Sequence, residues 1–239
     1  MVFERNYVLN PIKSFKNLTR LELCLWLSSV AVVIISGFFS GKGFFSTFAS
    51  LVGVTALIFC AKGDVFGQVL IICFAVLYGI VSCSFRYYGE AITYLGMSAP
   101  SAALAVVTWL KNPYDKEKCQ VKINGNPKPI EWVIIACLTL AVTTAFYFIL
   151  RALNTANLIV STFSVLTSFL AACLVFRRSR FYGIAYGMND IVLIILWVMA
   201  SFKDVRYIPM IACFIMFLLN DMYGFFNWSR MHRSQMRTA

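Results

Sequence analysis

FYGIAYGMNDIVLIILWVMA (residues 181–200) and YIPMIACFIMFLLNDMYGFFNW (residues 207–228) are two long apolar runs separated by a short charged turn. At about 1.5 Å of rise per residue, a helix over either run crosses the roughly 30 Å hydrocarbon core of a bilayer. The sequence therefore predicts a pair of membrane-spanning helices in this part of the chain.

Both runs carry polar residues at a depth where such residues are uncommon. Asn189-Asp190 lies midway along the first run, and Asn220-Asp221 lies in the last third of the second. An ionisable group costs roughly 2.5–3.5 kcal/mol at the bilayer centre on insertion scales, so it normally faces the bundle interior. On a 3.6-residue period the first run has one polar stripe, which comprises Tyr182, Tyr186 and Asn189, with Asp190 at its edge. This stripe predicts a pathway for a polar solute.

The composition of the whole chain is that of a membrane protein. Of its 239 residues, 60% are hydrophobic and 13% are charged, and the mean hydropathy is +0.78. A soluble fold of this size cannot bury so much apolar surface. The apolar runs are about twenty residues long, which excludes the short alternating strands of an outer-membrane barrel. We therefore expect an all-α polytopic membrane protein.

Other function classes are disfavoured by the distribution of charged and reactive residues. The net charge of +11 does not indicate a nucleic-acid partner, because the basic residues lie between apolar runs rather than on one amphipathic face. The eight cysteines are scattered without a CxxC pair and are expected to be small buried side chains. No Walker motif, metal constellation or nucleophile with a base is found, so no catalysis, metal or cofactor is expected.

Eight spans are expected, with an orientation that follows from the basic residues. The spans are residues 22–40, 43–61, 65–85, 87–110, 131–150, 156–176, 181–200 and 207–228. With eight crossings, sixteen of the 21 lysines and arginines fall on one side; the other side holds Lys42, Arg86, Arg151, Lys203 and Arg206. The positive-inside rule then predicts that both termini and the loop at 111–130 lie in the cytoplasm. The expected location is the cell inner (plasma) membrane.

That polar loop, residues 111–130, divides the chain into two similar halves. Its prolines and glycine indicate a turn and linker. Three spans precede it within residues 43–110, and three follow within residues 151–228 after a linker span at 131–150. Phe66-Gly67 opens the middle helix of one half as Tyr182-Gly183 opens that of the other. This predicts a SWEET-like 3+1+3 arrangement of parallel repeats, with an extra helix within residues 1–42 and a cytoplasmic tail at 229–239.

Polar and aromatic residues on five spans supply candidates for a binding site. The substrate-binding candidates are Tyr186, Asn189, Asp190, Tyr182, Trp197, Tyr94, Ser98, Ser164, Ser168, Gln68, Asn220 and Tyr223. Serines in membrane helices often bond their own helix carbonyls, and Asn220 could instead brace the cytoplasmic end. Gly96 and Pro100 predict a kink in span 87–110. The interfacial belt is expected to hold Trp109, Trp132 and Trp228.

Five runs of the sequence resemble the PnuC family of vitamin-precursor transporters, with the closest likeness to its nicotinamide riboside transporters. They are YYGEAITYLGMSAP (87–100), WLKNPY (109–114), NTANLIVSTFSVLTSF (154–169), NDIVLIILWVMAS (189–201) and NDMYGFFNW (220–228). The resemblance extends from about residue 43 to 230. It implies a SWEET-like core, a homotrimer, and facilitated diffusion with intracellular phosphorylation that traps the substrate. It also implies a ligand near the bilayer centre, at Tyr186, Asn189 and Asp190.

The identity of the substrate stays open at this point. Family members often carry a tryptophan where this chain has Tyr182 and Tyr186, and sister branches resemble thiamine or riboflavin carriers. Nicotinamide riboside has a flat pyridinium cation that tyrosine faces attract, but thiamine is also a flat cation. An ion-coupled vitamin carrier is a second hypothesis, because Asp190, Asp221 and Glu90 lie at membrane depth. A non-transporting structural membrane protein is a third, which the internal duplication disfavours.

Overall fold

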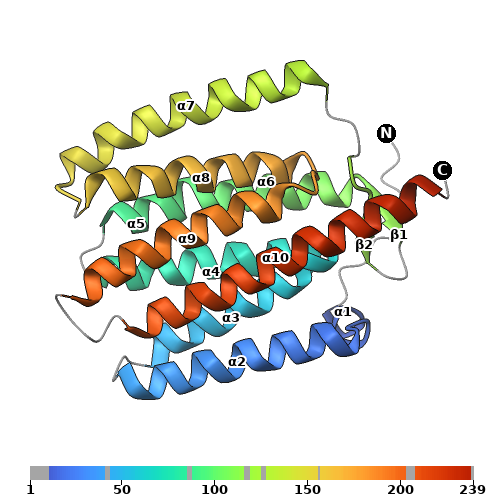
Figure 1. Cartoon of the computed structure of the whole chain (residues 1–239), viewed down its shortest axis with the longest axis horizontal. Coiled ribbons are helices and arrows are strands. Elements are labelled where there is room, and N and C mark those ends of the chain that lie inside the picture. The colour runs from blue at the N-terminus through green and yellow to red at the C-terminus, as the bar shows by residue number, and fades with distance from the viewer. Residues whose placement is uncertain are drawn as a thin grey trace.

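The computed structural model describes residues 11–40, 44–84, 88–115, 119–124, 128–155, 157–202 and 208–237. These residues form a bundle of long helices with a small two-stranded sheet at one end (Figure 1). The helices are α1 (Pro11–Lys16), α2 (Arg20–Ser40), α3 (Phe44–Lys62), α4 (Val65–Ser84), α5 (Tyr88–Thr93), the π-helical segment η1 (Tyr94–Ser98), α6 (Ala99–Leu110), α7 (Pro129–Ala152), α8 (Leu158–Phe176), α9 (Tyr182–Ser201) and α10 (Ile208–Arg237).

Long helices occupy all eight ranges in which spans are expected. Among the described residues, six are long and apolar enough to cross a membrane: α2, the continuous α5–η1–α6 segment, α7, α8, α9 and α10. The chain is therefore an all-helical, multi-pass membrane protein. The apolar stretches of α3 and α4 are shorter, Thr47–Lys62 and Val65–Ile80. That these two helices also cross the membrane, as an eight-span arrangement requires, stays a prediction.

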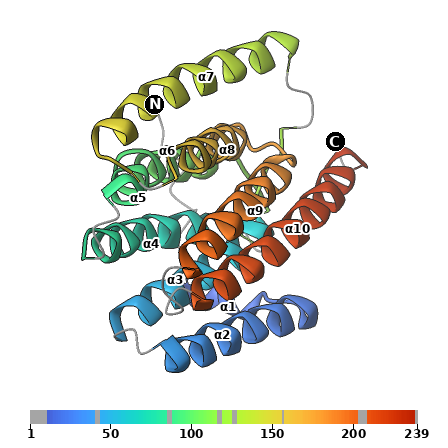
Figure 2. The ribbon, with the colours of Figure 1, turned by 60° about the vertical axis from the view of Figure 1, so that its left-hand side comes forward.

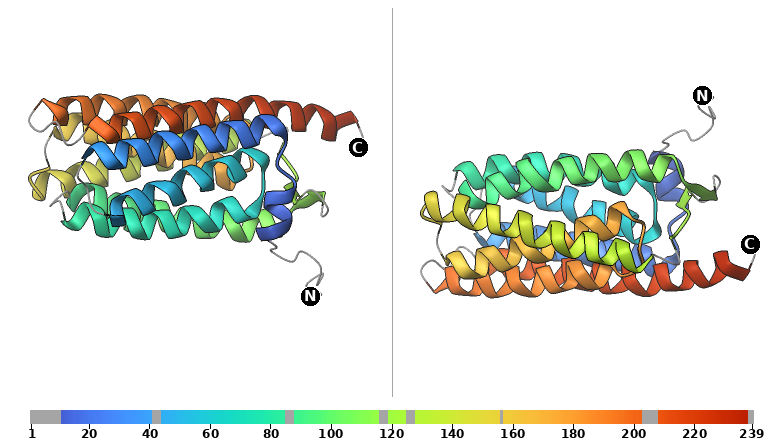
Figure 3. Two further views of the ribbon diagram at one scale, coloured as in Figure 1. Left: turned by 90° about the horizontal axis from the view of Figure 1, so that it is seen from below. Right: turned by 90° about the horizontal axis from the view of Figure 1, so that it is seen from above.

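Two helices lie at opposite edges of the bundle. α7 packs against α8 at one edge, and α2 packs against α3 and α10 at the other (Figures 1 and 2). Between them lie α3, α4, α6, α8, α9 and α10. The sheet, α1 and the last turns of α10 lie together at one end, which we call the hairpin end (Figure 3). The long helices therefore enclose an interior that runs from the hairpin end to the opposite, distal end.

Basic residues gather at the hairpin end. They lie on α1, at the C-terminal ends of α3, α6, α8 and α10, and on both sides of the sheet. Arg151, at the C-terminal end of α7, lies at the distal end. The remaining basic residues expected there, Lys42, Arg86, Lys203 and Arg206, lie outside the described residues. In the part of the chain that the structure describes, the basic residues therefore concentrate at the hairpin end, as the charge asymmetry of the sequence predicts.

The polar loop and the C-terminal segment fold onto each other, which the sequence did not indicate. Strand β1 (Pro113–Asp115) pairs antiparallel with β2 (Gln120–Val121), and α10 continues to Arg237. Gln235 Oε1 accepts a hydrogen bond from Ile123 N (2.9 Å), and its Nε2 donates to Val121 O (3.1 Å). The loop is therefore more than a linker. The side chain that orders it comes from more than a hundred residues away, so local turn signals could not reveal it.

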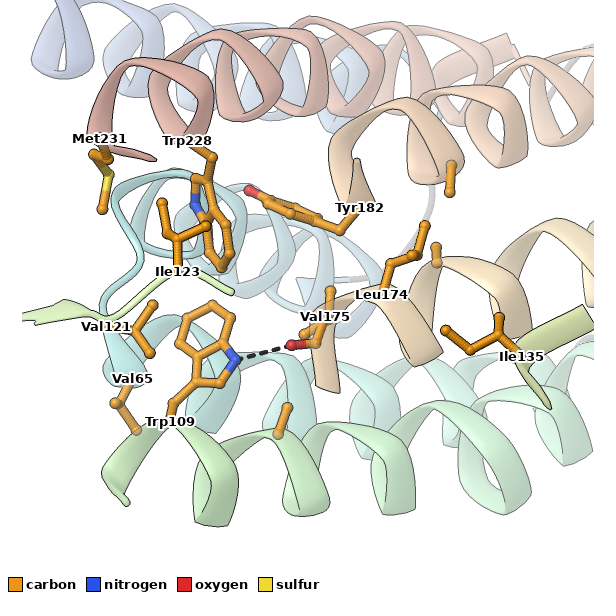
Figure 4. Packing of buried hydrophobic residues seen from close by; sticks show 13 residues of the cluster. Val65, Trp109, Val121, Ile123, Ile135, Leu174, Val175, Tyr182, Trp228 and Met231 are labelled. Atoms are coloured by element: carbon orange, nitrogen blue, oxygen red, sulfur yellow. Dashed lines mark hydrogen bonds between the residues drawn. The ribbon is translucent and has the colours of Figure 1, made fainter. Parts of the chain in front are cut away.

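The prediction of an interfacial belt is wrong for Trp109 and Trp228. Their side chains are 1% and 0% exposed, and their rings lie 5.4 Å apart at the hairpin end (Figure 4). Trp109 Nε1 donates to Val175 O (3.1 Å), and Trp228 Nε1 donates to Cys60 O (3.0 Å). Carbonyl groups at the ends of neighbouring helices thus satisfy both indoles in the interior. Trp132, in contrast, is exposed.

Two helix–helix turns at the hairpin end, α3–α4 and α8–α9, are built alike. Gly63 (φ +73°) ends α3 and Arg178 (φ +55°) ends α8, each in the left-handed region that closes a helix C-terminus. The following side chain then caps the next helix. Asp64 Oδ1 accepts from Phe66 N (2.9 Å) before α4, and Ser179 Oγ accepts from Phe181 N (3.4 Å) before α9.

A π-helical irregularity coincides with the kink predicted at Gly96 and Pro100, and the bend itself stays a prediction. Tyr94–Ser98 forms a π-helical segment in which Ala99 N donates to Tyr94 O, five residues back. Pro100 has no amide hydrogen to continue the α-helical pattern toward the preceding turn. The segment presents Tyr94 and Ser98 to the bundle interior, where a cavity lies.

Candidate substrate-binding site

A cavity of about 70 Å³ lies in the bundle interior. It is bounded by α3, α4, η1, α8, α9 and α10, and α9 contributes the polar stripe. Most of the predicted residues line it: Gln68, Tyr94, Ser98, Ser168, Tyr182, Tyr186, Asn189 and Asp190. The structure thus brings together residues from four helices that were singled out separately in the sequence.

Hydroxyl groups of α8 orient the Asn189 side chain. Its Oδ1 accepts hydrogen bonds from Ser164 Oγ (3.2 Å), Thr167 Oγ1 (3.0 Å) and Ser168 Oγ (2.9 Å). The amide oxygen is therefore fully engaged, while the Asn189 side chain also lines the cavity. The Nδ2 group is the part of this amide that is left to donate to a ligand acceptor.

Two carboxyl groups face the cavity from neighbouring helices. Asp190 on α9 and Asp221 on α10 are 3% and 4% exposed, and both line the cavity. Asp190 Oδ2 is buried and has no hydrogen-bond partner among the described residues. Neither lysine nor arginine is found among the described residues that line the cavity. The site therefore has acidic groups without a protein counter-ion.

Glycines allow α9 and α10 to approach closely enough to bring these carboxyl groups together. A Cβ at Gly183 would lie 2.5 Å from Asp221 O and 2.8 Å from Phe225 N. A Cβ at Gly187, one turn further along α9, would lie 2.6 Å from Met222 Cε. Small residues spaced by four are typical of close contacts between membrane helices.

Aromatic rings that were not predicted line the distal side of the cavity. Phe74, Phe214 and Phe217 are buried there. The Phe74 ring centroid lies 5.7 Å from that of Tyr94 and 5.9 Å from that of Phe217. The sequence prediction rests on polar stripes, to which phenylalanine does not belong, so it does not include these three residues. The spacing of Phe214, Phe217 and Asp221 on one helical face was the available signal.

The other four predicted residues lie outside the cavity lining. Ser164 contacts the site only through Asn189. Trp197 is buried in an apolar cluster toward the distal end. Asn220 Nδ2 donates to Ser29 Oγ (3.0 Å), and Tyr223 Oη donates to Glu22 Oε1 (3.0 Å). These last two side chains connect α10 to α2.

The size of the cavity indicates a contracted site. It measures about 70 Å³, whereas ligand sites commonly measure about 300 Å³ or more. Apolar clusters bound it on both sides, with Trp109 and Trp228 toward the hairpin end and Phe214 and Trp197 toward the distal end. A vitamin-sized solute therefore requires the helices to separate.

A larger hollow of about 330 Å³ lies between α6, α7 and α8. Its lining is mainly apolar, and its charged residues are Glu131 and Arg177, which form an ion pair with each other. Such a surface suits acyl chains of the surrounding lipid. The smaller interior cavity, with its amide, hydroxyl and carboxyl groups, is the better candidate for a polar solute.

Comparisons with known proteins point to one family. A family model described as nicotinamide mononucleotide transporter matches residues 43–230. A curated relative, the nicotinamide riboside transporter PnuC of Neisseria mucosa, is 24% identical over 212 residues, which is 87% of this chain and 80% of that protein. The crystal structure of a vitamin B3 transporter PnuC superposes with a TM-score of 0.81 at 22% identity and covers 95% of this chain and 100% of that one.

Proposed function

Because the chain belongs to the nicotinamide mononucleotide transporter family, we propose that it takes up nicotinamide riboside across a cell membrane. It is a transporter and not an enzyme. The observation that carries the choice of substrate is the interior cavity, in which tyrosines, two amides and two carboxyl groups meet. These groups match a flat cation with a carboxamide and ribose hydroxyls.

Each group has a distinct task in this proposal. The Tyr186 ring attracts the pyridinium cation, an interaction of about 0.5–2 kcal/mol that grows as water is removed. Asn189 Nδ2 donates to a carboxamide or ribose oxygen, because its Oδ1 is already engaged by α8. The other proposed substrate-binding residues that line the cavity are Tyr182, Asp190, Tyr94, Ser98, Ser168 and Gln68. Four residues outside the cavity lining are proposed to support them: Ser164, Trp197, Asn220 and Tyr223.

Transport in this proposal is facilitated diffusion. The solute moves down its own gradient, and phosphorylation inside the cell removes it from the equilibrium and so draws more inward. Such a cycle requires that the site opens to one side of the membrane and then to the other, and no second solute has to be carried. The Asn189 amide and the aromatic rings between the two apolar clusters suffice for this.

We also propose that the helices form two three-helix repeats, residues 43–110 and 151–228, joined by the linker span at 131–150. The α3–α4 and α8–α9 turns share their left-handed residue and their cap. The tryptophans are reciprocal as well, since each donates to the C-terminal end of the first helix of the opposite half. Two-fold pseudo-symmetry of a 3+1+3 fold accounts for both observations.

The proposed location is the inner (plasma) membrane with both termini in the cytoplasm. The clustering of basic residues at the hairpin end supports this orientation. A reporter fused after Ala239 and another inserted near Gly125 should both report from the cytoplasm, and an external location of either would contradict it. The resemblance to PnuC carriers further supports a homotrimer, which the mass of the purified protein in lipid nanodiscs would test.

A binding titration of the purified protein tests the choice of substrate. Nicotinamide riboside, thiamine and riboflavin are titrated in parallel at equal salt and pH. Nicotinamide riboside should bind at least about tenfold more tightly than the other two, a difference of about 1.4 kcal/mol. Preference for thiamine or riboflavin would favour the alternative, a carrier of another vitamin with or without ion coupling. The observation behind ion coupling is that the carboxyl groups of the cavity have no protein counter-ion among the described residues that line it.

A further inference from the structure

The two carboxyl groups of the cavity are a candidate for determining which solute charge the carrier accepts. We propose that Asp190 and Asp221 hold one proton between them and so present a single negative charge to a monovalent organic cation. This inference deepens the proposed function, because it rests on the same cavity being the substrate site. It assigns to the pair a selectivity for ligands with one positive charge.

The geometry places the two groups as one unit. Gly183 and Gly187 let α9 approach α10 closely, and both side chains are almost completely buried in the same cavity. The two carboxyl groups lie close enough to interact directly. Two carboxylates have acceptors only, so a hydrogen bond between them requires that one carries a proton.

The surroundings favour one charge rather than two. The titratable groups that face the pair are acids or neutral donors, and none is a lysine or arginine among the described residues that line the cavity: Cys60 on α3, Tyr94 on η1 beside Glu90 of α5, Tyr182 and Tyr186 on α9, and Cys213 on α10. Two adjacent carboxylates without a cation repel strongly in a medium of low dielectric constant. A single proton removes this repulsion.

The pair is then matched to its ligand in charge. A pyridinium ring that enters the cavity meets one delocalised negative charge, and the complex is neutral overall. A neutral analogue of the same shape leaves the charge unpaired, and such a buried charge is costly. Because the proton stays on the pair when the cation binds, binding neither releases nor takes up a proton. This agrees with downhill transport that is not coupled to protons.

Infrared difference spectroscopy of the ligand-free protein in nanodiscs tests the shared proton without any ligand. The wild type should show one C=O stretching band of a protonated carboxyl group that is absent from the double variant Asp190→Asn/Asp221→Asn. The control Glu131→Gln, which removes a carboxylate paired with Arg177 outside the cavity, should leave the band unchanged. Absence of the band in the wild type would overturn the proposal.

Calorimetry then tests the selectivity. The wild type should bind nicotinamide riboside about tenfold or more tightly than its neutral dihydro form. Asparagine imitates a protonated aspartate, so at least one single variant, Asp190→Asn or Asp221→Asn, should keep this ratio within about threefold, whereas the double variant should bring it close to one. Loss of the ratio in both single variants, or its retention in the double variant, would contradict a single shared charge.

The number of protons exchanged separates this inference from the proposed function. Titrations in two buffers with different ionisation enthalpies should reveal no proton exchange when the cation binds, and release of about one proton would overturn the inference. If the wild type binds thiamine but not nicotinamide riboside, the proposed substrate is wrong. The ratio of affinities for the cation and its neutral analogue is then measured with thiamine and its uncharged 3-deaza analogue. The infrared experiment uses no ligand, so it tests the shared proton whichever substrate is bound.

Discussion

Asn189 shows how one helix prepares a side chain on another. Three hydroxyl groups of α8 surround its amide oxygen, so the amide cannot rotate without losing them. The sequence shows these hydroxyls only as a serine- and threonine-rich run, 161–168, which usually bonds its own helix. Here two of the three serve the neighbouring helix instead, and only Thr167 also bonds its own helix carbonyls.

Substitution of this amide should affect binding more than folding. Asn189→Leu should weaken nicotinamide riboside binding by about 1–3 kcal/mol, the usual loss when a polar ligand group is left unpaired. Membrane insertion should be retained, because leucine costs less than asparagine in a bilayer. Calorimetry and expression level measure the two effects. Thr144→Leu, on an exposed face of α7, is the control and should leave affinity unchanged. Wild-type affinity in a folded Asn189→Leu protein would place the site elsewhere.

At the scale of residues, the sequence predicted the polar side of the site but not its apolar side. Buried polar groups in a membrane helix are costly, so Asn189 and Asp190 stand out in any apolar run. Phe74, Phe214 and Phe217 do not stand out, because phenylalanine is as stable facing lipid as it is in the bundle interior. The positions of Trp109 and Trp228 were predicted wrongly for a related reason. Tryptophan near a span end is typical of the membrane interface, and only the tertiary packing reveals the interior carbonyl groups that accept hydrogen bonds from these two indoles.

At the scale of helices, the contact between α9 and α10 depends on glycine. Gly183→Ala should place a methyl group against backbone atoms of α10 and destabilise the protein by about 1–3 kcal/mol, as overpacking does. Thermal unfolding in nanodiscs measures the loss. Gly96→Ala is the matched control, because its added Cβ would meet only Ile92 Cγ2, at 3.9 Å. Equal stability of the two variants would show that α9 and α10 are not in such close contact.

We predict that the π segment before Pro100 is a hinge of the bundle. The cavity is too small for a vitamin, and η1 forms part of its wall. Pro100→Ala would restore an amide hydrogen and favour a regular helix, so transport should slow while equilibrium binding is nearly retained. Initial uptake rates and binding constants of the same preparation provide the test. An unchanged uptake rate of Pro100→Ala would show that the π segment is an irregularity of packing and not a hinge.

The helices themselves were predictable, but the hairpin end was not. Apolar runs of about twenty residues determined the eight long helices to within a few residues, except that α10 continues to Arg237, well beyond the predicted end. That extension is polar, and its stability comes from contacts such as Gln235 with β2, which no local pattern encodes. The sheet was missed for the same reason.

At the scale of the whole molecule, the reciprocal tryptophans provide a test of the repeat arrangement. Trp109→Phe and Trp228→Phe each remove one hydrogen bond to an equivalent carbonyl, so each should destabilise the fold by a similar amount, about 0.5–1.5 kcal/mol from the bond alone. Thermal unfolding of both variants measures this. Trp132→Phe, at an exposed position, should have little effect. A large loss in one variant and none in the other would argue against two-fold equivalence.

Uptake of labelled nicotinamide riboside into liposomes that contain only this protein, without any ion gradient, tests the central claim most directly. The proposed carrier should bring the internal concentration up to the external one and no further, and Asn189→Leu should slow the approach. A concentration that stays at the level of protein-free liposomes would contradict transport of this solute. Accumulation above the external concentration when a proton or sodium gradient is then imposed would contradict facilitated diffusion.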